Sequence, residues 1–172
     1  MTQQTIAGRG TELTHLVDVI DAGLPLDQQR DWPAWMLDVM PGVKSLATIA
    51  PQFMLWLITD AGVPGMDGDT IAPAKRRAAE AIQDGLPDYI AETEVDFLAL
   101  IYRRSTLFTA LCCAEDHALD ILRTAVSDDI HAAADCASLS ADAFGDGPDR
   151  AEFYGRMADK LIELLAAAQV AT

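Results

Sequence analysis

The sequence feature that most constrains the fold is the spacing of apolar residues, which recur at steps of three, four or seven over much of the chain. This is the period of an amphipathic helix, and no segment of useful length alternates apolar and polar residues as a half-buried strand would. After Tyr89 the period is carried by Ile90, Phe97, Ile101, Phe108, Leu111, Leu119, Leu122, Val126 and Ile130. The spacing predicts an all-α protein.

Proline and glycine divide this pattern into separate helices, because proline suits the first turn of a helix and glycine follows its C-terminal end. Residues 1–10 are expected to form a loose segment, and Pro25, Pro33 and Pro41 predict an irregular corner after the first helix. The clearest predicted helices are residues 11–23 with Thr11 as the cap, 51–61 opened by Pro51, 73–84 opened by Pro73, and 148–169 opened by Pro148.

The long apolar pattern after Tyr89 is expected to form two helices. A single helix of about 40 residues would span about 60 Å, which exceeds a compact domain. The break is predicted near Arg104–Thr106 or near Glu115–Asp116. With glycine-rich loops at residues 62–70 and 142–149, residues 1–172 predict a single-domain helical bundle of about six or seven helices.

The charge of the chain indicates which partners it favours. Asp and Glu outnumber Lys and Arg by 27 to 12, which gives a formal net charge of −15. This charge repels nucleic-acid phosphates and anionic membranes. We therefore expect neither direct nucleic-acid binding nor membrane binding, and favour another protein with a basic surface as the partner.

Cysteine usage favours a cytoplasmic location. Cys112, Cys113 and Cys136 are odd in number and two of them are adjacent, which suits structural disulfides poorly. No basic and apolar leader pattern of a secretory signal follows Met1. The longest uncharged stretch, residues 45–59, is too short to cross a bilayer comfortably and contains a proline.

Weak candidates for a metal site are Cys113, His117 and Asp120, which share one helical face. One helix rarely encloses a metal, and no Glu-x-x-His motif of a di-iron bundle is present. The alternative is that the cysteine is buried and the histidine lies on the helix surface. No cofactor is predicted.

The other histidines lie near carboxylates that could make them bases. His131 stands within a helical turn of Asp128 and Asp135, and His15 within a turn of Asp18. No convincing nucleophile is adjacent, so ordinary ion pairing is the alternative. Phosphate-binding glycine loops, zinc knuckles and hydrolase elbows are also absent from the sequence. We therefore predict no catalytic residues and favour a protein that is not an enzyme.

Three surface features are candidate interaction sites. The basic triplet of residues 75–77 could contact a phosphate or an acidic partner, or could simply be solvated. All three tryptophans lie within residues 32–56, and Trp32 and Trp35 could supply affinity in a groove or instead belong to the core. Residues 124–149, called the acidic stretch here, contain no Lys or Arg and six aspartates: Asp128, Asp129, Asp135, Asp142, Asp146 and Asp149.

A short segment resembles a known family. The run from Cys113 to Leu122, with Phe153 and Tyr154 later opening a helix, is similar to the helical chaperones that mature molybdoenzymes. Only Asp116 and His117 match the family's Glu-Pro-x-Asp-His pattern, since Cys113 and Ala114 stand where the family has Glu and Pro. The resemblance implies a maturation chaperone that binds a leader peptide or an unfolded client.

Together these features favour a non-enzymatic, protein-binding module of the inhibitor, immunity or adaptor type. Its acidic stretch would steer a basic partner, and Trp32 and Trp35 would contribute affinity. The alternatives are a metal- or ligand-binding helical bundle and a maturation chaperone for a larger enzyme.

Overall fold

The structure is a computed structural model that describes residues 3–28, 46–69, 71–85, 89–106, 113–127 and 129–170. These residues contain seven helices and no strand, which confirms the predicted all-α bundle. The helices are α1 (Gln3–Gly23), α3 (Leu46–Thr59), α4 (Ala72–Gln83), α5 (Tyr89–Thr106), α6 (Cys113–Ala125), α7 (Ala132–Asp142) and α8 (Pro148–Val170).

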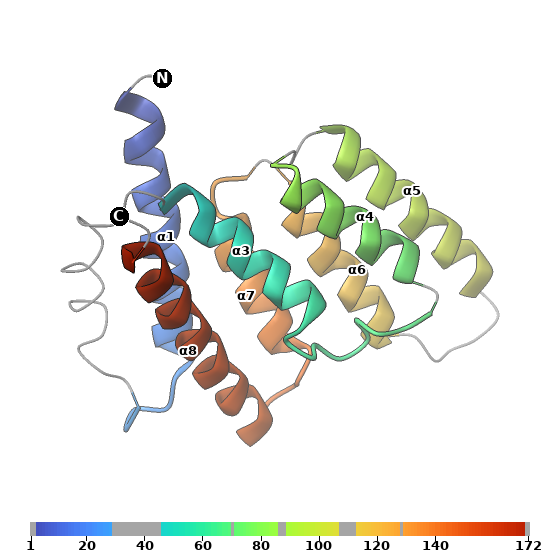
Figure 1. Cartoon of the computed structure of the whole chain (residues 1–172). Helices are drawn as coiled ribbons and strands as arrows, with labels where there is room; N and C mark the ends of the chain where they lie inside the picture. The colour runs from blue at the N-terminus through green and yellow to red at the C-terminus, as the bar shows by residue number, and fades with distance from the viewer. Residues whose placement is uncertain are drawn as a thin grey trace.

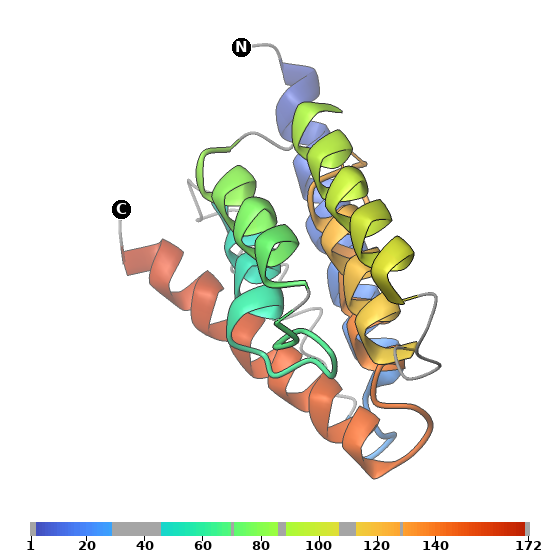
Figure 2. The ribbon, with the colours of Figure 1, turned by 90° about the vertical axis from the view of Figure 1, so that its right-hand side faces the viewer.

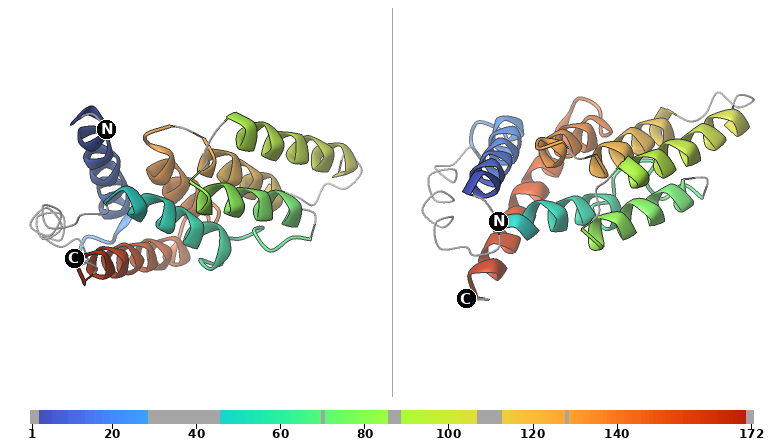
Figure 3. Two further views of the ribbon diagram at one scale, coloured as in Figure 1. Left: turned by 45° about the horizontal axis from the view of Figure 1, so that its top comes forward. Right: turned by 90° about the horizontal axis from the view of Figure 1, so that it is seen from above.

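Five of the helices pack in two layers (Figure 1). One layer holds α3 and α4, and the other holds α1, α7 and α6, as Figure 2 shows from the side. At one end α8 packs against α1 and α3, while at the other end α5 packs against α4 and α6 (Figure 3). Buried side chains of all seven helices form one continuous apolar cluster.

Helix α7 lies at the centre of this cluster and contacts α1, α3, α6 and α8. Its buried residues are all small, which lets neighbouring helices approach closely on several sides. They are Ala132, Ala133, Ala134, Cys136, Ala137, Ser140 and Ala141. The position of α7 therefore depends on small side chains rather than on a single amphipathic stripe.

Several predicted helix ends are confirmed. Helix α4 has Pro73 in its first turn and ends before Gly85, whose φ of +67° is the left-handed conformation that glycine favours after a helix. Helix α8 begins at Pro148, as predicted. The apolar pattern after Tyr89 divides between α5 and α6, with α5 ending at Thr106.

Three predictions of local structure are wrong. Helix α1 begins at Gln3, so residues 3–10 are helical and Thr11 lies inside the helix; extending a helix backward from the buried Leu13 costs little once it has formed. Helix α3 continues through Pro51, and the burial of Ile49 and Ala50 ahead of it offsets the lost hydrogen bond. The apolar period also includes Ile130, but Ile130 lies in the segment between α6 and α7 and is 54% exposed.

The loop between α3 and α4 packs closely on the first turn of α6. Val63 and Met66 in this loop are buried. At Gly65, whose φ is +82°, an added Cβ would lie 2.2 Å from the carbonyl oxygen of Ala114. The glycine-rich sequence therefore permits a close backbone contact that fixes α6 beside α4.

Among the described residues, no helix is both long and apolar enough to span a membrane.

Candidate functional site

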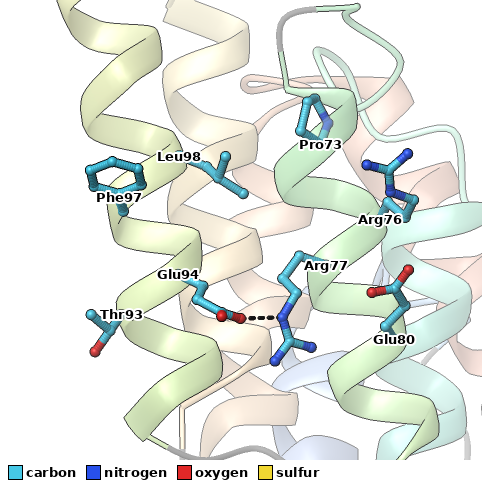
Figure 4. A pocket seen from close by; sticks show the side chains of 8 residues that line it. All are labelled: Pro73, Arg76, Arg77, Glu80, Thr93, Glu94, Phe97 and Leu98. Atoms are coloured by element: carbon cyan, nitrogen blue, oxygen red, sulfur yellow. Dashed lines mark hydrogen bonds and ion pairs between the residues drawn. The ribbon is translucent and has the colours of Figure 1, made fainter.

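The strongest candidate site is a groove between α4 and α5, at one end of the bundle (Figure 4). Helix α5 packs on α4 and α6 and contains the fully buried Ala91 and Val95, while its opposite side has no helix packed on it among the described elements. The groove has a volume of about 520 Å³ and is lined by Pro73, Arg76, Arg77 and Glu80 of α4 and by Thr93, Glu94, Phe97 and Leu98 of α5.

The groove continues onto an exposed apolar stripe, called the α5 outer face here. Phe97, Leu100 and Ile101 are 61%, 53% and 50% exposed, whereas Leu98, one residue after Phe97, is partly buried against the core. Figure 4 shows Leu98 between the two helices and Phe97 on the outer side of α5. Elsewhere in the described chain only Leu26 and Ile130 are large apolar residues with comparable exposure.

Ion pairs fix the two walls of the groove. Arg77 donates from Nε to the Glu94 carboxylate, so this pair joins α4 to α5 across the groove. Arg123 of α6 forms an ion pair with Asp96 on α5. The side chains of both pairs are more than a quarter exposed, so solvent weakens each attraction. Their main effect is to set the orientation of α5.

The basic triplet does not form one patch. Lys75 Nζ lies 2.9 Å from Asp67 Oδ1 in the preceding loop, and Arg77 pairs with Glu94. Arg76 is exposed and has no ion-pair partner within the described residues. These contacts explain why cations lie near the positive end of a helix dipole, where they do not stabilise the helix itself.

The acidic stretch is less free than its sequence indicates. Arg150 follows it directly, and its guanidinium nitrogens lie 2.6 Å from Asp142 Oδ1 and 3.3 Å from Asp146 Oδ1. Two of the six aspartates therefore share one cation, because the first turn of α8 returns Arg150 to the loop before it.

The remaining aspartates of the acidic stretch lie near helix starts. Asp129 Oδ1 accepts a hydrogen bond from the backbone N–H of His131, 2.8 Å away. Asp135 and Asp149 are exposed in the first turns of α7 and α8, where a negative charge favours the helix dipole. Asp128, like Trp32 and Trp35, lies outside the described residues.

The residues proposed for a metal have other contacts. His117 Nε2 lies 2.5 Å from the carbonyl oxygen of Leu139, which links α6 to α7, and Asp120 Oδ1 lies 3.5 Å from Arg123. The side chain of Cys113 is outside the described part of the chain. Within that part, no three His, Cys, Asp or Glu residues form a group that could hold a metal ion.

The structure brings together two histidines that the sequence did not relate. His15 of α1 and His131, which precedes α7, have ring centroids 4.7 Å apart in an edge-to-face arrangement. The sequence alone relates each histidine only to carboxylates within one helical turn of it. The contact arises because α1 packs along α7, and no local pattern indicates it.

No protein-family model, curated protein or solved structure matches this chain.

Proposed function

We propose that the protein is a non-enzymatic module that binds another protein through the α5 outer face and the adjoining groove. The observation that carries the proposal is the exposure of Phe97, Leu100 and Ile101 at 61%, 53% and 50%. Residues spaced by three and four positions lie on one side of a helix, so these side chains form a single stripe. Apolar side chains gathered in one exposed patch are typical of interaction sites, whereas single exposed ones are ordinary.

The shape of the site favours a helical segment of the partner. The groove runs between two helices, and grooves of this kind receive the apolar face of an amphipathic helix. The groove lining itself holds two arginines and two glutamates, but the whole chain carries a net charge of −15. The partner helix should therefore carry basic residues beside its apolar face, as the acidic composition of the chain also predicts.

A cross-linking experiment tests the location of the site. A photoreactive amino acid replaces Leu100 in one variant and Leu26 in another, because Leu26 is also apolar and is 87% exposed but lies outside the groove. In cells that produce the protein, we expect Leu100 to capture a specific partner that Leu26 does not. Identical cross-links from both positions would contradict the proposal.

The affinity of the captured partner gives a quantitative test. Phe97→Ala should weaken binding about tenfold or more, as a central apolar contact does. Because Phe97 is 61% exposed, the same change should alter the free energy of unfolding by only about 0.5 kcal/mol or less. Leu26→Ala serves as the matched control and should leave the affinity unchanged. Equal affinities for the two variants would refute a site on α5.

The acidic surface has a separate expected effect, on the rate of association. Asp129→Asn combined with Asp135→Asn removes two exposed charges without altering the groove. A basic partner should then associate more slowly and with a weaker dependence on salt, because long-range attraction acts mainly on encounter. An unchanged association rate would show that these aspartates do not steer the partner.

A further inference from the structure

A second site of a different kind lies on the opposite side of the bundle from α5, where α1 packs along α7. His15 and His131 meet there with ring centroids 4.7 Å apart and an interplanar angle of 68°. Both side chains are partly buried and still reach solvent. This contact joins two elements that are far apart in the sequence.

One ring nitrogen in this pair is left without a partner. His131 Nδ1 is buried and accepts or donates no hydrogen bond to any described residue. A buried polar atom of this kind costs about 1–3 kcal/mol unless something binds it, and such atoms are often explained by a bound water or ion. The backbone N–H of His131 donates to Asp129 Oδ1, which holds the residue in place ahead of α7.

The spacing of the rings fits two ligands of one ion. With a metal–nitrogen distance of about 2.0–2.1 Å, two imidazoles in adjacent positions on an ion have centroids roughly 4.5–5 Å apart. The observed 4.7 Å lies in this range. Neutral imidazole is a preferred ligand of Zn²⁺, Ni²⁺ and Cu²⁺, and not of Mg²⁺ or Ca²⁺.

We infer that His15 and His131 form a two-imidazole site for a divalent transition-metal ion at the contact between α1 and α7. Within the described residues no third side chain completes a group of three, so water fills the other positions and the affinity is modest. Binding should follow the order Cu²⁺, then Ni²⁺, then Co²⁺. The ion would stabilise the packing of α1 on α7, since it binds the folded state only.

The test is calorimetric titration with Ni²⁺ of the full chain, without a histidine tag and with Cys112 and Cys113 changed to serine. These changes remove two thiols that could bind the ion independently. We expect one saturable site whose affinity falls about tenfold or more in His15→Ala and in His131→Ala. His117→Ala is the matched control and should bind Ni²⁺ as the parent does, because its ring contacts Leu139 instead.

A spectroscopic measurement keeps the inference testable if an alanine variant unfolds. Electron paramagnetic resonance of the Cu²⁺-loaded parent should show two imidazole nitrogens on the ion, and His15→Gln should reduce this to one. Absence of a saturable site, or equal binding by the parent and the His15 variants, would overturn the inference and leave the pair as an aromatic contact.

Discussion

Gly65→Ala should destabilise the protein more than Gly62→Ala, although both glycines lie in the same loop with positive φ. The φ values are +82° at Gly65 and +67° at Gly62. A Cβ at Gly65 would lie 2.2 Å from the Ala114 carbonyl oxygen, whereas a Cβ at Gly62 would meet no atom within 4 Å. The comparison therefore separates the cost of the backbone conformation from the cost of displacing α6.

The expected magnitudes follow from these two costs. A left-handed conformation costs an alanine roughly 1–2 kcal/mol, which applies to both variants. Only Gly65→Ala also separates the loop from the first turn of α6, which adds about 1–3 kcal/mol as for other overpacked contacts. For a domain of this length each kcal/mol lowers the melting temperature by about 2–4 °C.

Urea denaturation followed by far-UV circular dichroism measures the difference directly. The dependence of the unfolding free energy on urea should stay the same in both variants, so that the shift in midpoint reports stability. We expect Gly65→Ala to unfold at a clearly lower urea concentration than Gly62→Ala. If the two midpoints coincide, the close contact of the loop with α6 does not exist in solution and the reasoning fails.

Three further predictions concern the core. Ser140→Ala should leave stability unchanged or raise it by up to about 1 kcal/mol in thermal unfolding, because Ser140 Oγ is buried and has no hydrogen-bond partner among the described residues. Burial, and secondarily the Asp135 charge, raises the pKa of the Cys136 thiol. Above about pH 8.5 only the unfolded chain loses this proton, so the free energy of unfolding should decrease as the pH rises. In Cys136→Ala the free energy of unfolding, measured by urea denaturation at several pH values, should decrease less steeply. Gly23→Ala should lower the melting temperature, because its Cβ would lie 2.3 Å from the buried Tyr154 ring.

The sequence predicted most helix ends where a local rule applies. Pro73, Gly85 and Pro148 stand where their backbone preferences place them. The errors arose where tertiary packing or a side chain outweighed such a rule. Apolar burial carries α3 through Pro51, and the hydrogen bond from the His131 N–H to Asp129 competes with a continuous helix before α7.

The candidate sites were less predictable than the helices. The apolar period includes Phe97 and Ile101, but period alone does not tell whether a face meets the core or solvent. It is the position of α5 at the end of the bundle that leaves this face exposed. Similarly, a count of charges within residues 124–149 missed Arg150 of the next helix, which forms ion pairs with two of the aspartates.

By itself the sequence determined that the chain is helical, acidic and broken at particular prolines and glycines, because these properties depend on residues within a few positions of one another. Only the tertiary structure decided that Arg77 reaches Glu94, that His15 meets His131, and that one face of α5 stays open. Such contacts join residues on different helices. They follow from how the helices pack around the small side chains of α7, and packing has no local signature in the sequence.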